Sequence, residues 1–230
     1  MKMRTINTIL AAGLICGMGS VQAEDDSGMG LGLGVKAGTL GYGVEVTKSF
    51  SDRFSGRVGF NSYSDSDSTT ESGIDYDLEL DLKTTTALLD FHPFKGAFRL
   101  SLGYVANSNR FDMTGKPVAA TYDINGTIYN AAEVGQVTGD VTFGSGTYVG
   151  LGWGNAGDGK GFGMSVDLGI FQQGSPDLSL AASGPITDPT SPVYDPNFAT
   201  DLQNEVNSAE KDLEDFQQYP VIALGITYGF

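Results

Sequence analysis

The sequence predicts an all-β fold, an eight-stranded antiparallel transmembrane β-barrel with structured external loops that include one amphipathic helix. Three observations predict it. A secretory signal opens the chain, eight later segments alternate between apolar and small or polar residues, and the final segment, YPVIALGITYGF, closes on Phe230. An apolar face opposite a small, polar face is typical of a barrel that contacts lipid outside and encloses a polar lumen.

The first 23 residues have the three parts of a signal peptide. Lys2 and Arg4 give a positive start, residues 9–15 are apolar, and small residues form a cleavage site at the end of the segment. We therefore expect export and a mature chain of one domain, residues 24–230. The lone Cys16 lies in the signal peptide, so the mature domain has no disulfide and no thiol chemistry.

The mature chain is strongly acidic. Loss of Lys2 and Arg4 with the signal peptide leaves 11 basic residues against 28 acidic ones, a net charge of −17. This charge argues against nucleic acid and anionic lipid headgroups as partners, and it attracts cations.

The chain has no apolar run long enough for a membrane helix. Such a helix needs about 18 consecutive apolar residues, and no mature segment approaches this length. Because lipid accepts only helices and closed barrels, the exported chain either crosses the membrane as strands or is a soluble β-protein. A soluble sheet normally exposes its charged face. Here the second face is mostly glycine, serine and threonine, which favours the barrel.

Eight segments show the period-two alternation of strands. They are residues 29–38, 42–47, 54–61, 75–91, 98–104, 147–153, 162–170 and 222–230. The segments are joined by short turns and by three long connections, at 64–74, 109–139 and 174–218. Short periplasmic turns and long external loops are the usual arrangement of such barrels, and an even strand number places both termini in the periplasm.

Two of the long connections contain structure of their own. Apolar residues recur at helical spacing from Phe198 to Phe216, so we expect an acidic amphipathic helix at about 197–217. Asn125-Gly126 inside the alternating segment 122–129 predicts a β-hairpin. Counting this hairpin in the barrel wall would make ten strands, but neither of its faces is apolar enough for lipid, so we expect eight.

Strand parity sends six ionisable side chains into the lumen. They are Lys36, Glu45, Arg57, Asp90, Arg99 and Asp167. Buried charges are retained only when they are paired, and the interior of an eight-stranded barrel is just wide enough for side chains. We interpret the set as an ion network that plugs the barrel. A gate or solute path is the alternative, because ionisable groups inside a membrane are functional candidates.

Seven acidic residues around the first long connection predict a negative external vestibule. They are Asp65, Asp67, Glu71, Asp75, Asp77, Glu79 and Asp81. Such a vestibule would steer cationic solutes such as basic amino acids. A merely solvated acidic loop is the simpler alternative, and calcium binding is a weaker one because no EF-hand loop is present. Asp77, Glu79 and Asp81 differ in parity from Asp90, which requires a bulge or a strand that extends past the bilayer.

The sequence does not predict an enzyme. The only histidine, His92, follows a strand at a periplasmic turn, whereas barrel hydrolases hold their histidine near the outer rim. The glycines of residues 30–34 imitate a phosphate loop, but no helix follows them. We therefore expect no catalytic residues, no metal site and no cofactor.

Several segments, taken in their order, resemble the CarO-like outer-membrane proteins. They are FHPFKGAFRLSLGY (91–104), YDINGTIYNAAEVGQVTG (122–139), YVGLGWGN (148–155), DLGIFQQGSPDLSL (167–180), the acidic helix and the closing YPVIALGITYGF. The resemblance implies an eight-stranded barrel with structured external loops and porin-like uptake of ornithine or other small solutes. The first external region differs most, so the solute preference is not carried over.

Two functional hypotheses follow. The first is a CarO-like barrel in the outer membrane of a Gram-negative bacterium that allows limited passive entry of small, cationic solutes. The second is a closed structural or surface-interaction barrel that acts through its external loops. In both we expect a monomer that is surrounded by outer-membrane lipid and inserted by the barrel assembly machinery.

Overall fold

The computed structural model describes residues 30–230 except 72–73, 118–119, 155 and 158. The predicted signal peptide lies outside the described residues. Among those residues, no helix combines the length and the apolar character that crossing a membrane requires.

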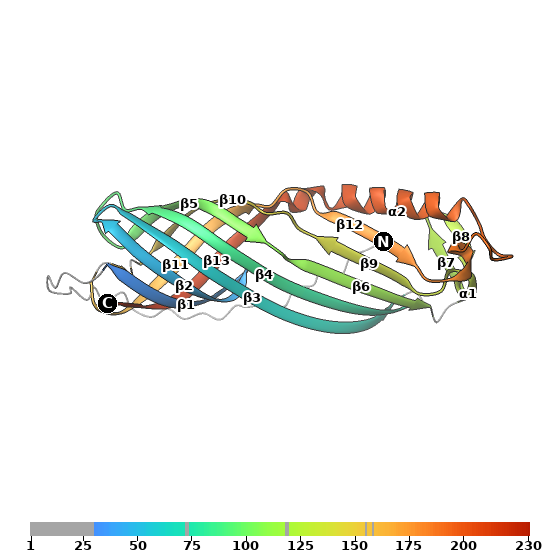
Figure 1. The fold of residues 1–230 in the computed structure, drawn as a ribbon, viewed down its shortest axis with the longest axis horizontal. Coiled ribbons are helices and arrows are strands. Elements are labelled where there is room, and N and C mark those ends of the chain that lie inside the picture. Colours follow the sequence, from blue (N-terminus) through green and yellow to red (C-terminus); the bar gives the residue numbers. More distant parts are fainter. Residues whose placement is uncertain (1–29, 72–73, 118–119, 155, 158) are drawn as a thin grey trace.

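Eight antiparallel strands close into a ring, as predicted. They are β1 (Leu31–Gly38), β2 (Gly41–Ser51), β3 (Phe54–Glu71), β4 (Ile74–Phe91), β5 (Phe98–Asn107), β10 (Gly146–Trp153), β11 (Gly161–Gln172) and β13 (Gln218–Gly229). The first and last strands seal the ring, with Val35 opposite Ile226, and β4 pairs with β5 on the far side. Figure 1 shows the ring side-on, with the short turns and the C-terminus at one end, which we call the turn end.

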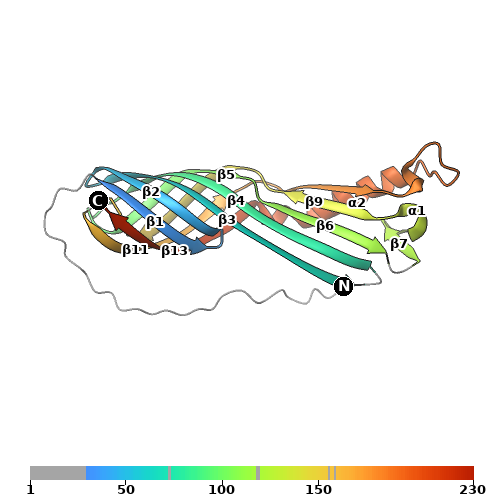
Figure 2. The ribbon, with the colours of Figure 1, turned by 60° about the horizontal axis from the view of Figure 1, so that its bottom comes forward.

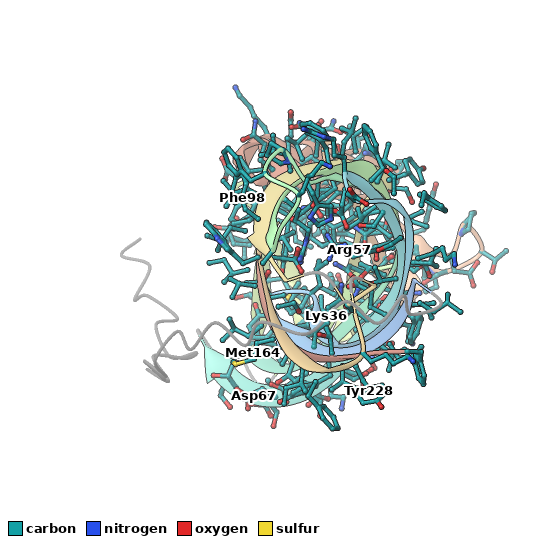
Figure 3. The ribbon with its side chains drawn as sticks, turned by 90° about the vertical axis from the view of Figure 1, so that its left-hand side faces the viewer. Lys36, Arg57, Asp67, Phe98, Met164 and Tyr228 are labelled. Atoms are coloured by element: carbon teal, nitrogen blue, oxygen red, sulfur yellow. The ribbon has the colours of Figure 1, made fainter. Side chains whose placement is uncertain are left out.

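The outer surface of the ring is apolar. Its exposed side chains include Val35, Val44, Val58, Leu102, Val149, Met164, Leu224 and Ile226. In Figure 3 the labelled Phe98, Met164 and Tyr228 point away from the ring, whereas Lys36 and Arg57 lie inside it. Burial of polar groups with exposure of apolar ones is the reverse of a soluble sheet, and it is the pattern that the sequence predicted.

Aromatic rings gather on the outer surface at the turn end. Phe98 packs edge-on against Trp153 with ring centroids 5.2 Å apart, and Tyr228 packs between Phe162 and Phe230 at 5.0 and 5.1 Å. Aromatic belts of this kind mark the boundary between lipid and water in membrane proteins. Phe230 therefore lies beside Tyr228 on the outer surface of the ring.

On one side of the ring the sheet continues far past the other strands. β3 and β4 stay paired up to Glu71 opposite Ile74, and β6 (Arg110–Pro117), β9 (Val137–Thr142) and β12 (Asp177–Ala182) continue the sheet from β4. We call this part the extension (Figures 1 and 2). On the opposite side β1 and β2 are joined by the two residues Thr39 and Leu40, so there the wall is low.

The expectation of a loop at 64–74 was wrong. Residues 64–71 and 74 belong to the β3–β4 hairpin, because serines and acids on β3 alternate in register with leucines and acids on β4. The other two long connections also contribute strands, β6, β9 and β12, that the sequence analysis did not predict. β4 serves both parts, since Thr84–Phe91 pair with β5 and Ile74–Asp81 pair with β6.

The tip of the extension contains the predicted hairpin and helix. β7 (Thr121–Ile124) and β8 (Thr127–Asn130) form a separate two-stranded sheet, and the positive φ angles of Asn125 (53°) and Gly126 (78°) suit its tight turn. The hairpin is thus not part of the wall. The acidic helix is α2 (Phe198–Asp212), and a 3₁₀ turn, η2 (Glu214–Gln217), follows it.

The hairpin, α2 and two short helices share a small apolar core. The short helices are α1 (Ala131–Val134) and η1 (Pro185–Thr187). Phe198 packs edge-on against Tyr129 at 5.0 Å, and both rings are buried together with Ile186 and Val134. The apolar stripe of the helix therefore packs on the tip, as its spacing predicted.

Acidic residues of α2 hold the helix in place. Asp201 accepts a hydrogen bond of 2.6 Å from the Tyr129 hydroxyl, and Glu205 accepts one of 2.9 Å from the backbone amide of Asn125. Farther along, Glu210 accepts a bond of 3.2 Å from the amide of Leu178 on β12. These three carboxylates bind structural donors.

Tyr129→Phe should loosen the tip without affecting the barrel. Burial, followed by the hydrogen bond to Asp201, raises the pKa of Tyr129 to about 12, and the same hydroxyl lowers the pKa of Asp201. The variant keeps the ring and loses the bond, so we expect faster hydrogen exchange at Asn125 and in the first turns of α2. Tyr194→Phe, which alters an exposed ring, should change nothing.

This contact should also depend on pH in a defined way. Because the pKa of Asp201 is lowered on folding, its contribution is present above the unfolded value and is lost as the pH falls through the folded one. Because the pKa of Tyr129 is raised, its contribution is present below the unfolded value and is lost as the pH rises through about 12. Equal exchange in wild type and variant at neutral pH would contradict the assignment.

Candidate functional site: the lumen and the acidic hairpin

All six ionisable residues predicted for the lumen come together inside the ring. Each comes from a different strand: Lys36 from β1, Glu45 from β2, Arg57 from β3, Asp90 from β4, Arg99 from β5 and Asp167 from β11. We call them the charged layer. Their side chains are 0 to 11 % exposed, and three bases face three acids, so the layer has no net charge.

Arg57 is the centre of the charged layer. Its Nε and Nη2 donate to the two oxygens of Asp90 at 2.5 and 3.1 Å, a bidentate pair. Its Nη1 donates to Glu45 at 3.2 Å and to Asp167 at 3.2 Å. One guanidinium thus joins carboxylates from β2, β4 and β11, which lie on different sides of the ring.

The remaining members complete the layer. Lys36 Nζ contacts Glu45 at 2.7 Å, and Arg99 Nη2 contacts Asp167 at 2.8 Å. Ser101 donates to Asp90 at 2.5 Å, and Arg99 also donates to the carbonyl of Gly154. Every charge has a partner of opposite sign, which is the condition under which buried charges are tolerated.

Glycines leave room for polar side chains of the lumen. A Cβ built on Gly59 would lie 2.9 Å from Thr86 Oγ1 and 3.5 Å from Lys36 Nζ. A Cβ on Gly152 would lie 3.1 Å from the guanidinium carbon of Arg99. A larger residue at either position would displace part of the polar interior.

A second, apolar layer closes the lumen on the side of the extension. It consists of Leu40, Leu88, Val105, Tyr148, Phe171 and Val221. Sequence analysis missed this layer, although the parity of Tyr148 and Phe171, which are opposite each other in β10 and β11, could have indicated it.

Leu40 reaches the apolar layer from the short β1–β2 turn. Hydrogen bonds tie this turn to β13: Thr39 donates to the carbonyl of Pro220 at 2.9 Å, and Tyr219 donates to the carbonyl of Thr39 at 2.5 Å. Leu40 is therefore a fixed part of the closure rather than a solvated loop residue.

Little space remains between the side chains of the lumen. Two interior cavities beside the layers have volumes of about 20 Å³ and about 10 Å³. A buried water occupies roughly 10–15 Å³. Among the described side chains, Tyr148 Oη and Arg99 Nε are buried without a partner, so a single water is the occupant that fits. Neither of these two cavities has room for a small organic solute.

The predicted acidic residues of the vestibule do not face a common space. The register of the β3–β4 hairpin places Asp65 and Asp67 opposite Leu80 and Leu78, on the inner face of the extension. Asp75, Asp77, Glu79 and Asp81 lie opposite Thr70, Ser68, Ser66 and Ser64, on its outer face. The side chain of Glu71 lies outside the described residues. The parity conflict with Asp90 is resolved without a bulge in β4, because the strand extends past the ring.

Two of the four acids on the outer face of β4, Asp77 and Asp81, have basic partners. Lys116 contacts Asp77 at 2.9 Å, Lys83 contacts Asp81 at 3.1 Å, and Arg110 contacts Asp112 at 2.7 Å. Asp65 and Asp67 take part in none of the ion pairs found in the described part of the chain; each instead accepts from the amide of the serine that follows it. The two faces thus differ in how far their charge is neutralised.

His92 is buried at the turn end. Its Nδ1 lies 2.8 Å from the carbonyl of Gly96 and must carry the proton there, which leaves Nε2 to accept from Ser55 at 3.1 Å. One nitrogen thus holds the β4–β5 turn, and the other links it to β3. In the described residues no group of three His, Cys, Asp or Glu side chains has a geometry that could hold a metal ion.

Arg57→Met should destabilise the barrel strongly. Three buried carboxylates would lose their shared partner, and breaking a buried ion pair costs about 3–5 kcal/mol. Denaturant unfolding in detergent micelles, followed through the single tryptophan, Trp153, measures this loss. Lys95→Met breaks the exposed pair with Asp52 and should leave the midpoint unchanged. Equal midpoints for all three proteins would show that the charged layer does not stabilise the fold.

The sequence matches no protein-family model and no curated protein. Two solved structures from Acinetobacter baumannii are similar in fold. CarO has a TM-score of 0.54 and 20 % identity, and CarO2 has a TM-score of 0.53 and 19 % identity. Each alignment covers 86 % of this chain and 97 % of the other. The chain therefore has the CarO-like barrel fold that the sequence resemblance implied.

Proposed function

We propose that this protein is an outer-membrane β-barrel whose lumen is closed at rest and which acts at the cell surface through its extension. The observation that carries the proposal is the closure of the lumen by two layers, one charged and one apolar. Cavities of about 20 Å³ and about 10 Å³ hold a water molecule and no solute. The extension, by contrast, carries exposed ion pairs such as Asp81 with Lys83 and Asp77 with Lys116.

The surface of the ring supports the membrane location. Leu102, Val149 and Met164 are 59, 60 and 67 % exposed, a pattern that costs free energy in water and is favourable in lipid. An aromatic belt bounds this surface at the turn end, and charged strands begin at its other end. The secretory signal predicted at residues 1–23 and the terminal Phe230 support export and insertion by the barrel assembly machinery.

The two ends of the ring define its orientation. β1 begins and β13 ends at the turn end, beside the β2–β3 and β4–β5 turns, and barrels of this kind have both termini in the periplasm. The extension then projects from the cell. We propose a monomer without enzymatic activity, since the ring closes within one chain and its buried polar groups bind one another.

Passive entry of small solutes is a second candidate function, and the charged layer supports it. A barrel that served only as an anchor could pack its interior with apolar side chains. Here the half of the lumen at the turn end is polar and balanced in charge, so movement of Arg57 away from its partners would leave a path lined by carboxylates. Small cations are the solutes that such a path would favour.

Heat-modifiable migration tests the barrel itself. A closed barrel keeps its hydrogen bonds in mild detergent, so the unboiled protein should migrate as a compact band and the boiled protein as an unfolded one. A double variant, Leu102→Ser with Val149→Ser, makes the outer surface of the ring more polar and should weaken insertion of the protein into lipid vesicles. Identical migration before and after boiling would contradict the barrel.

Planar bilayer recording tests the closure. Wild type should give no conductance steps in potassium chloride or lysine chloride. The double variant Arg57→Ser with Phe171→Ala removes bulk from both layers and should give conductance steps. Either single variant should give fewer steps than the double variant, because one layer remains intact. Each variant is checked first for heat-modifiable migration. Regular steps from wild type would overturn the closed-lumen proposal and favour solute entry.

A further inference from the structure

We propose that the free edge of β3, from Tyr63 to Glu71, binds a basic, extended segment of a partner polypeptide by strand addition. This inference rests on the proposed role of the extension at the cell surface and names the kind of partner that it accepts. The edge, its charge and its side-chain pattern each contribute to the argument.

The edge is open over nine residues. β2 pairs with β3 only as far as Tyr42 opposite Ser62, because the short turn at Thr39 and Leu40 ends the neighbouring wall there. β3 nevertheless continues, paired with β4 alone, to Glu71. Figure 2 shows β3 as the free margin of the extension. An open strand edge presents a row of backbone donors and acceptors to any chain that can pair with it.

Side-chain contacts show which groups face outward from this edge. The amides of Ser66 and Ser68 donate to the carboxylates of Asp65 and Asp67 at 3.0 and 2.9 Å. An amide that donates to a neighbouring side chain does not donate to β4. The backbone groups of Ser66 and Ser68 therefore point away from β4, toward the open edge. Each aspartate therefore covers one edge donor in the absence of a partner.

The charge of the edge is not neutralised. On the outer face of the same hairpin, Asp77 and Asp81 are paired with Lys116 and Lys83. Asp65 and Asp67 take part in none of the ion pairs described for the chain, and Figure 3 shows Asp67 outside the ring, well away from Arg57. Carboxylates in this setting favour a cationic partner.

Strand addition by a basic segment would satisfy both features together. The carbonyls of the incoming strand replace the aspartates at the amides of Ser66 and Ser68, and the released carboxylates pair with basic side chains opposite them. Cross-strand pairs of opposite charge stabilise a sheet. A neutral strand would displace the carboxylates without offering them a partner, so the edge discriminates in favour of basic sequences.

Side chains of the edge also define the pattern of the partner. Asp65 and Asp67 lie on the inner face, and Ser64, Ser66 and Ser68 lie on the outer face. The complementary segment alternates basic residues with small or hydroxyl-bearing ones. A second copy of this chain fits poorly, because antiparallel pairing of two β3 edges would bring aspartates close to aspartates, and like charges in adjacent strands are destabilising.

Peptide binding to the whole mature protein in detergent micelles tests the proposal. The probe is a fluorescently labelled nine-residue peptide of alternating lysine and threonine, and polarisation measures its binding at low and high salt. We expect saturable binding that weakens with salt. A control peptide has the same sequence, with N-methyl groups on the amides that would face β3. It keeps the charge but cannot donate backbone hydrogen bonds to β3, so it should bind about tenfold more weakly.

Matched protein variants locate the site. Asp65→Asn with Asp67→Asn should weaken binding about tenfold, since two cross-strand ion pairs are lost. Asp75→Asn with Glu79→Asn removes the same charge from the outer face of the same hairpin and should leave binding unchanged. Hydrogen exchange at Ser64, Ser66 and Ser68 should slow on addition of the peptide to wild type.

Three results would overturn the proposal: no binding at low salt, equal binding of the N-methylated peptide, or equal weakening by both pairs of variants. The last two would indicate attraction by net charge alone. Self-association of the protein without peptide would identify a second copy as the occupant. Heat-modifiable migration of each variant reports independently on the barrel, so failure here is distinguishable from failure of the proposed outer-membrane role.

Discussion

The guanidinium of Arg57 is the interaction on which the barrel depends. It joins carboxylates of β2, β4 and β11 across the full width of the lumen. The side chains of the charged layer pair with one another and fill the part of the interior at the turn end, and Gly152 leaves room for the guanidinium of Arg99. The strand register follows, since a slip of one residue would turn Arg57 toward lipid.

The two sides of the ring differ in how far their strands continue past it. The wall is low at Thr39 and Leu40, where hydrogen bonds fold the turn inward, and high at β3 and β4, where β6, β9 and β12 continue the sheet. This asymmetry creates the open edge of β3 and also protects the opposite margin, because α2 covers β12 through the contact of Glu210 with Leu178. One margin of the extension is thus covered and the other is available.

The sequence was informative where one face of a strand had to meet lipid. Period-two alternation located all eight strands of the ring, and parity brought Lys36, Glu45, Arg57, Asp90, Arg99 and Asp167 together correctly, because both depend on the pleat alone. Outside the ring neither face is lipid-facing, so alternation carries less information, and β6, β9 and β12 were missed. The prediction of a shared vestibule was wrong because residues 64–71, expected to be a loop, continue β3, and the register with β4 then places Asp67 and Asp77 on opposite faces. Tyr148 and Phe171 were missed because the lumen was expected to be lined by small residues.

The seam between β1 and β13 has a consequence for assembly. It joins the first strand of the ring to the last, and the amide of Phe230 donates to the carbonyl of Leu31, so the ring can seal only when both strands are in place. Until then Lys36 and Asp167, which lie on opposite sides of the seam, are not enclosed. In the sealed ring Lys36 pairs with Glu45, and Asp167 pairs with Arg99. Sealing the seam therefore does two things in one step: it completes the hydrogen-bonded ring, and it encloses the charges of the interior.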